Sequence, residues 1–203
     1  MKIICIGRNY AQHAKELGNL IPEKPVIFLK PDTALLKNNA HFYYPDFTHE
    51  LHFEVELVFK ISKTGKHINR EFAHKYFDEI GIGIDFTARD IQNECKQKGL
   101  PWEIAKAFDG SAPVGSFISK NNFPDLKNIS FQLSKNGSIV QKSNSSNMIF
   151  FIDEIIEYVS SFFTLKPGDL IFSGTPEGVG AVQKGDKLEA FINESKLLEI
   201  GIK

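Results

Sequence analysis

Short apolar runs alternate with polar and glycine-containing breaks along the chain, and several of these runs predict β-strands. Residues 3–6 and 26–29 are continuous apolar stretches, and Lys30-Pro31 closes the second of them. Runs of this length between turn signals are typical of buried strands. Asn136-Gly137 suits a type I′ hairpin turn. Similar stretches predict further strands over residues 80–86, 129–133, 138–141, 170–173 and 187–192.

Residues 51–59 follow the period of a β-strand. The odd-numbered positions are all apolar, and positions 52, 54 and 56 are polar. Strict alternation of this kind predicts a strand with one buried face. Val58 interrupts the polar face, so we expect that face to turn towards the interior as well.

Helix signals occur at three places. Asn9 offers an N-cap for a helix over residues 10–17 that Gly18 would end. Thr87 offers a cap for a second helix that ends at Gly99.

The third predicted helix covers residues 152–163, where apolar residues keep helical spacing after a Ser- and Asn-rich cap. Strands outnumber helices and do not alternate with them regularly, which indicates an α+β fold. The length of 203 residues, with no linker-like segment, suits a single domain over residues 1–203.

Charge and cysteine content exclude several classes of protein. The 24 basic and 25 acidic residues give a net charge of −1, which offers no electrostatic footprint for nucleic acid or an anionic membrane. The first apolar run is too short for a signal peptide. Cys5 and Cys95 fit neither a disulfide framework nor a zinc cluster. We therefore expect a cytoplasmic protein with free thiols.

Three acidic residues could form an all-oxygen metal site. Glu54 and Glu56 share one strand face, roughly 6.5 Å apart at Cα, where their charges repel unless a cation lies between them. Asp85 interrupts an apolar run where a strand leads into a helix. Such ligands favour Mg²⁺ or Mn²⁺. The alternatives are a solvated face for the glutamates and a turn-capping role for Asp85.

Other side chains with candidate chemistry lie outside this acidic group. His13 and Glu16 are i,i+3 neighbours, as in a general base with its orienting carboxylate, or they lie on an exposed helix face. Lys106 lies in an apolar stretch, where it either pairs with a buried anion or protects an edge strand. The glycine-rich loop 173–180 lacks a phosphate-loop ending, although its N–H groups and Thr175 could bind an anion.

Taken in order, these segments resemble the fumarylacetoacetate hydrolase family, and within it the small acylpyruvases and oxaloacetate decarboxylases. Seven blocks in the order of the family are a far more specific signal than any one of them. The matching stretches are Gly7-Arg-Asn-Tyr-Ala-Gln-His-Ala-Lys-Glu16, Phe28-Leu-Lys-Pro31, His52-Phe-Glu-Val-Glu-Leu57, Asp85-Phe-Thr-Ala-Arg-Asp-Ile-Gln92, Lys98-Gly-Leu-Pro-Trp102, Ala105-Lys-Ala-Phe108 and Ser173-Gly-Thr-Pro-Glu-Gly-Val-Gly180.

The resemblance implies a mixed β-sandwich roll, usually in a homodimer, with Mg²⁺ as cofactor and Mn²⁺ as a substitute. The implied metal ligands are Glu54, Glu56 and Asp85. The implied catalytic residues are the water-activating pair His13 and Glu16, and Lys106 beside the oxo-acid oxygens. The implied substrate-binding residues are Arg8, Lys30, Gln92 and Thr175.

The resemblance also implies a reaction. A pyruvoyl group would chelate Mg²⁺, and cleavage of the adjacent C–C bond would leave a metal-bound pyruvate enolate. One site could thus hydrolyse acylpyruvates, with water activated by His13, and decarboxylate oxaloacetate. The alternatives are an isomerase or decarboxylase of aromatic-degradation intermediates, of the 2-hydroxyhepta-2,4-diene-1,7-dioate isomerase type, and a catalytically silent protein that binds a small oxo acid.

Overall fold

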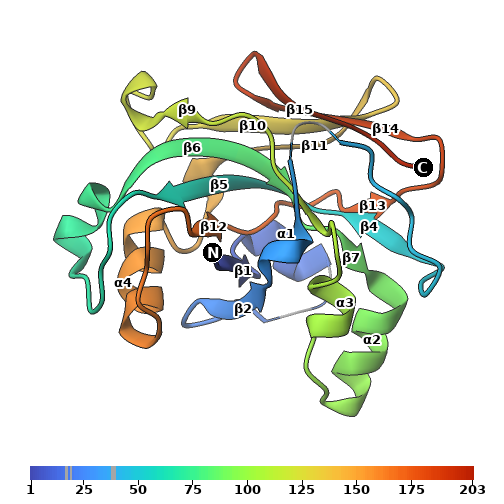
Figure 1. The fold of residues 1–203 in the computed structure, drawn as a ribbon, viewed down its shortest axis with the longest axis horizontal. Coiled ribbons are helices and arrows are strands. Elements are labelled where there is room, and N and C mark those ends of the chain that lie inside the picture. The colour runs from blue at the N-terminus through green and yellow to red at the C-terminus, as the bar shows by residue number, and fades with distance from the viewer. Residues whose placement is uncertain (17, 19, 38–39) are drawn as a thin grey trace.

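Two main β-sheets pack face to face in this computed structural model, which describes residues 1–16, 18, 20–37 and 40–203 (Figure 1). In those residues the larger sheet has the strand order β2 (Val26–Lys30), β1 (Ile3–Gly7), β12 (Leu170–Phe172), β5 (Val55–Ile61), β6 (Phe77–Ile84) and β9 (Ile118–Ser119). The smaller sheet has the order β11 (Ser138–Asn144), β10 (Ser130–Lys135), β14 (Lys187–Ile192) and β15 (Ser195–Gly201). Because β1 and β12 are parallel and the other neighbours antiparallel, the larger sheet is mixed, as predicted.

Shorter elements surround the two sheets. One small sheet has the strand order β13 (Gly180–Ala181), β4 (Leu51–Phe53) and β7 (Thr87–Ala88). A second small sheet pairs β3 (Leu35–Leu36) with β8 (Ala112–Pro113). The α-helices are α1 (Ala11–Glu16), α2 (Arg89–Lys98), α3 (Glu103–Lys106) and α4 (Ile152–Phe162). Short 3₁₀ helices cover Asp32–Ala34, Arg70–Lys75, Lys120–Asn122 and Ser145–Asn147. Within the described residues, none of the helices has the length and hydrophobicity that a bilayer crossing requires.

Both faces of β5 are buried. Leu57 lies in the core between the two main sheets, together with Phe131 of β10. Val58 lies in a second apolar cluster on the opposite face, with Ile3 and Phe172. The prediction that the Glu54–Glu56 face turns inward is therefore confirmed.

The predicted hairpin and the end of the second helix are also confirmed. Asn136 and Gly137 join β10 to β11 with φ angles of 53° and 83°, the left-handed backbone that a type I′ turn requires. Gly99 ends α2 with φ 65°.

The predicted N-caps are wrong. The Asn9 side chain bonds Phe150 and Ser173 instead of capping α1, whose predicted last residue Leu17 lies outside the described residues. Thr87 lies in β7, and Ala88 precedes α2. In the Ser- and Asn-rich segment, Asn144 caps a 3₁₀ helix and not α4. Each of these side chains has a partner other than the first turn of the predicted helix, so a capping residue type in the sequence does not by itself determine a cap.

The predicted strand over residues 51–59 is interrupted at Glu54, where the chain passes from β4 in a small sheet to β5 in the larger one. The pairs on either side, Val55 with Ile84 and His52 with Thr87, keep one register. This register sets Glu54 opposite Asp85, whose N–H donates to the Glu54 carbonyl at 2.8 Å. The metal-ligand candidates thus meet where two paired strands change sheets together.

Candidate metal centre and active site

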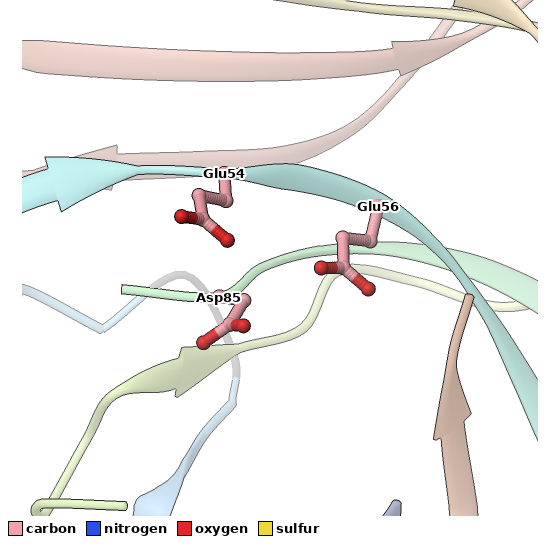
Figure 2. Close-up of side chains that lie close together, drawn as sticks. All are labelled: Glu54, Glu56 and Asp85. Carbon is pink, nitrogen blue, oxygen red and sulfur yellow. The ribbon is translucent and has the colours of Figure 1, made fainter. Parts of the chain in front are cut away.

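The carboxylates of Glu54, Glu56 and Asp85 converge below the β5–β6 pair (Figure 2). Ligand oxygens of all three lie within 4.8 Å of one another, and each of the three residues is at most 6% exposed. Glu56 lies in β5, Glu54 lies in the break between β4 and β5, and Asp85 directly follows β6, the strand paired with β5. The solvated-face alternative for the glutamates is therefore wrong.

This arrangement fits a divalent cation. Burial, reinforced by the charges of Asp85 and Glu54, raises the pKa of Glu56 well above its usual range, and the Gly174 N–H at 2.6 Å only partly opposes this shift. A cation between the three groups would relieve that repulsion. Three carboxylate donors with no sulfur or nitrogen ligand match the preference of Mg²⁺ and Mn²⁺.

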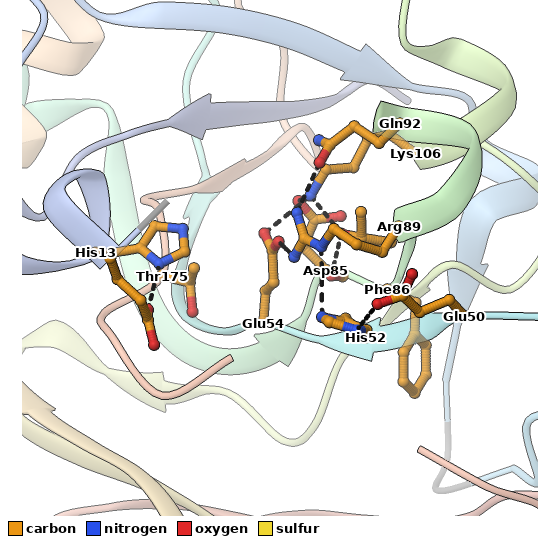
Figure 3. A network of polar contacts seen from close by, with 12 residues as sticks. His13, Glu50, His52, Glu54, Asp85, Phe86, Arg89, Gln92, Lys106 and Thr175 are labelled. Carbon is orange, nitrogen blue, oxygen red and sulfur yellow. Dashed lines mark hydrogen bonds and ion pairs between the residues drawn. The ribbon is translucent and has the colours of Figure 1, made fainter. Parts of the chain in front are cut away.

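Buried cations, among them Lys106 and Arg89, lie beside the carboxylates of Glu54 and Asp85 (Figure 3). The Lys106 ammonium contacts Glu54 at 2.9 Å, Asp85 at 2.6 Å and the Thr87 hydroxyl at 2.6 Å. Lys30 contacts the other Asp85 oxygen at 2.7 Å. Burial alone would lower the pKa of Lys106, but Asp85 and Glu54 outweigh it and raise that pKa. Lys106 lies in α3 and is 3% exposed, which excludes the edge-strand alternative.

Arg89 is a site residue that the sequence did not reveal. Its guanidinium bonds Glu54 at 2.5 Å and the Gln92 side-chain oxygen at 2.6 Å, and it is 6% exposed. Burial would raise the pKa of Glu54, but Lys106 and Arg89 hold it well below its usual range. The sequence feature that could have indicated a role for Arg89 is its i,i+3 spacing from Gln92 on one helix face, four residues after Asp85.

His13 and Glu16 form the expected pair. His13 Nδ1 lies 3.2 Å from a Glu16 oxygen, and the imidazole is buried. The Gly178 N–H donates to the same carboxylate at 3.2 Å. The glycine-rich loop therefore supplies N–H groups to the protein's own carboxylates, through Gly178 to Glu16 and through Gly174 to Glu56. With Nδ1–H directed at Glu16, the Nε2 atom is left to accept a proton.

One cavity connects most of these groups. His13 and Lys106 line it together with the three carboxylates. Of the predicted substrate-binding residues, it is lined by Arg8, Gln92 and Thr175. Lys30 does not line this cavity: its ammonium forms an ion pair with Asp85 and donates hydrogen bonds to Ser111. A direct substrate contact for Lys30 stays a prediction.

A second residue that sequence reasoning missed is Gln141 of β11, which positions Thr175 from outside the cavity. Its amide nitrogen donates to the Thr175 hydroxyl at 3.0 Å, and its oxygen accepts from the Val55 N–H at 2.9 Å. Nothing in the local sequence around Gln141 indicates this role, since Val55 lies in the other main sheet and Thr175 in the loop between β12 and β13.

Comparisons with known proteins place this geometry in a family. The model of the fumarylacetoacetate (FAA) hydrolase C-terminal family matches residues 2–202. The chain belongs to the fumarylacetoacetate hydrolase family. This confirms the resemblance and the α+β sandwich expected from it.

Named relatives of this fumarylacetoacetate hydrolase family member are enzymes. It is 43% identical to the mitochondrial oxaloacetate tautomerase FAHD1 of Bos taurus, over 94% of this chain and 86% of that protein. It is also 43% identical to the mitochondrial oxaloacetate decarboxylase of Dictyostelium discoideum, over 94% and 88%. The crystal structure of fumarylpyruvate hydrolase from Pseudomonas aeruginosa in complex with Mn²⁺ and pyruvate superposes with a TM-score of 0.94 at 37% identity, over 100% of this chain and 89% of that one.

The Lys106 contacts lead to a first prediction. Lys106→Met keeps most of the side-chain volume but removes the positive charge beside the carboxylates. We expect turnover of acylpyruvate and oxaloacetate to fall by about a hundredfold or more, as for other groups that stabilise developing negative charge. Steady-state rates with saturating Mg²⁺ measure this. Lys98→Met on the exposed end of α2 is the control, and near-normal rates in Lys106→Met would make Lys106 a structural lysine.

Proposed function

We propose that this protein is a divalent-metal-dependent enzyme that cleaves the C–C bond of 2,4-dioxo acids such as acylpyruvates and decarboxylates oxaloacetate. The observation that carries the proposal is the convergence of Glu54, Glu56 and Asp85 in a buried cavity that Lys106 and His13 also line. Both reactions release a pyruvate enolate, so one site that stabilises this anion serves both.

The site residues have separable tasks in this proposal. A divalent cation held by the three carboxylates supplies a Lewis acid that stabilises negative charge on the oxo-acid oxygens. Lys106 and Arg89 keep Glu54 ionised and therefore ready to bind a cation. Thr175 offers a hydroxyl to the carboxylate beside the oxo group, and Arg8 adds a positive charge to the cavity that receives the anionic substrate. These groups lie in fixed positions before substrate arrives, which reduces reorganisation during the reaction.

Hydrolysis requires one further group. His13 Nε2 would take a proton from water as that water attacks the distal carbonyl of the 2,4-dioxo acid, and Glu16 would stabilise the resulting imidazolium. Decarboxylation of oxaloacetate needs no attacking water, because CO₂ leaves directly. The His13–Glu16 pair is the feature that favours a hydrolase.

A tautomerase is the second candidate, because relatives at 43% identity carry that name. Interconversion of enol and keto oxaloacetate passes through the same enolate but breaks no C–C bond. It needs a group that moves a proton to and from carbon, and His13 is a cavity-lining base suited to this.

A substrate panel tests the proposal. The purified protein with Mg²⁺ or Mn²⁺ is incubated with acetylpyruvate, fumarylpyruvate and oxaloacetate. We expect pyruvate as a product from all three, together with a carboxylic acid or CO₂. Loss of the enol absorbance of oxaloacetate without any pyruvate would identify a tautomerase. Binding without a product would identify a silent oxo-acid-binding protein, and both outcomes would overturn the proposed C–C bond cleavage.

We further propose that the protein acts as a homodimer in the cytoplasm, as the family resemblance implies. Gel filtration with light scattering measures the mass in solution, for which twice the 22.9 kDa of one chain is expected.

A further inference from the structure

Two cations of the cavity lining have no acidic partner among the residues that the structure describes. Lys96 and Arg8 both line the cavity, and neither forms an ion pair with another described residue. The nearby carboxylate of Glu16 is bonded by His13 and by the Gly178 N–H instead. Unpaired cations at the mouth of a binding cavity attract anions.

The inner part of the cavity is already balanced. With every group ionised, the carboxylates of Glu54, Glu56 and Asp85 are matched by the cations of Lys30, Lys106 and Arg89. A divalent cation adds a charge of +2, and an oxo-acid carboxylate with its developing enolate adds −2. The reacting end of the substrate therefore leaves the charges of Arg8 and Lys96 unmatched.

The position of Lys96 on α2 extends the site outwards. Arg89, Gln92 and Lys96 lie at i, i+3 and i+7, a spacing that places them on one helix face. Arg89 and Gln92 are buried and bonded to each other. Lys96 lies about 10 Å beyond Arg89 along the helix axis and is exposed. The same face thus leads from the carboxylates to the entrance of the cavity.

Packing holds the Lys96 ammonium at that entrance. It lies 5.9 Å from the centre of the Trp102 ring, which in turn contacts Phe28 edge-on. Partial burial, and then the charges of Arg89 and Arg8, lower the pKa of Lys96. These cations repel one another, and a bound anion would relieve that repulsion.

Arg8 directly follows β1 and also lines the cavity. Its φ of 61° is unfavourable for a residue with a side chain. The adjacent Asn9 fixes this backbone through side-chain bonds to Phe150 and Ser173. The strained conformation is therefore imposed by the surrounding structure, and it sets Arg8 in the cavity lining.

We propose that Lys96, together with Arg8, binds the second carboxylate of a dicarboxylic oxo acid and so makes the enzyme prefer substrates that are charged at both ends. This inference rests on the proposed function and adds a residue that determines specificity.

Two matched substrates test the inference. Fumarylpyruvate and acetylpyruvate share the pyruvoyl end and the bond that breaks, but only fumarylpyruvate has a distal carboxylate. For Lys96→Gln we expect kcat/KM for fumarylpyruvate to fall about tenfold or more, mainly through KM, which is the effect of one lost charge-assisted hydrogen bond. We expect kcat/KM for acetylpyruvate to change less than about twofold. Lys98→Gln, on the same helix but paired with Glu94, is the control.

A binding measurement separates this inference from the proposed reaction. 2-Oxoadipate and 2-oxohexanoate have the same chain length and differ only in the second carboxylate. In the presence of Mg²⁺, Lys96→Gln should weaken binding of 2-oxoadipate and leave that of 2-oxohexanoate unchanged, whether or not the protein cleaves any dioxo acid. Equal effects on both ligands, or no effect on either, would overturn the role of Lys96. Failure of the wild type to cleave either dioxo acid would count against the proposed function alone.

Discussion

Removal of divalent metal with EDTA is expected to abolish turnover of every oxo-acid substrate, and Mg²⁺ or Mn²⁺ is expected to restore it. The reason is that Glu54, Glu56 and Asp85 together present a buried all-oxygen site. Without a cation, only protein cations remain to stabilise the enolate. Rates are measured after gel filtration in EDTA and during a metal titration, with metal content checked independently. Full activity in a protein shown to be metal-free would refute the assignment.

A Glu56→Gln change separates metal binding from folding. Its amide oxygen can still accept the Gly174 N–H, but the carboxylate charge is lost. We expect metal affinity to fall at least about 10- to 100-fold, which is the cost of losing a group that merely supports a ligand. Metal at a hundred times the wild-type Kd should raise the Tm of the wild type by about 5–10 °C and that of the variant by about half as much or less. Glu194→Gln, in an exposed turn, is the control.

The Glu56→Gln variant also tests how the stability of the metal-free protein depends on pH. Burial, Asp85 and Glu54 raise the pKa of Glu56 in the folded protein above its value in the unfolded chain. The stability that this group contributes is therefore complete below the unfolded pKa and is lost as the pH rises through the folded pKa. In metal-free wild type, the free energy of unfolding should fall over that pH window, and in Glu56→Gln this fall should be smaller. Urea unfolding at a series of pH values measures the difference.

His13→Ala is expected to lose acylpyruvate hydrolysis by about 10²–10⁴-fold while keeping most oxaloacetate decarboxylation. Hydrolysis needs a base for water, whereas decarboxylation needs only the charges that stabilise the enolate and a proton donor. Glu16→Gln should show the same pattern more mildly, because it weakens the orientation of the imidazole but keeps its basic nitrogen.

The ratio of the two activities, measured on one preparation with saturating Mg²⁺, is the decisive quantity. A change that only loosens α1 over the cavity would lower both rates together by admitting water. Lys15→Ala, an exposed change on α1, controls for this effect. An unchanged ratio in both variants would mean that His13 and Glu16 are not the water-activating pair.

The sequence by itself determined the features that depend on local periodicity. Alternation around Glu54 and Glu56 indicated that both lie on one strand face, and Val58 indicated that this face is buried. The Asn136-Gly137 turn and the glycine end of α2 were also readable, because a positive φ restricts the residue type. Two glutamates in a strand could thus be identified as metal-ligand candidates before any contact was known.

The local helix caps could not be determined in the same way. Asn9 and Thr87 have polar atoms that could cap a following helix, yet Asn9 bonds Phe150 and Ser173, and Thr87 accepts a hydrogen bond from Lys106. These partners are distant in the sequence. Such a side chain can form hydrogen bonds of similar energy with partners that are near or distant in the sequence. Tertiary packing determines which of these partners is within reach.

Tertiary structure alone assembled the charges of the site. The register that sets Glu54 opposite Asp85 follows from the pairing of β5 with β6, over a sequence separation that local patterns cannot span. Lys106 and Arg89 are surface-type residues by composition, and each is stable in the interior because it meets a carboxylate there. The sequence could therefore identify the acidic ligand candidates. The positions of the compensating cations, and those of Lys96 and Arg8, depend on how the sheets and helices pack. The physical reason is that a buried charge is tolerated only where the fold places an opposite charge beside it.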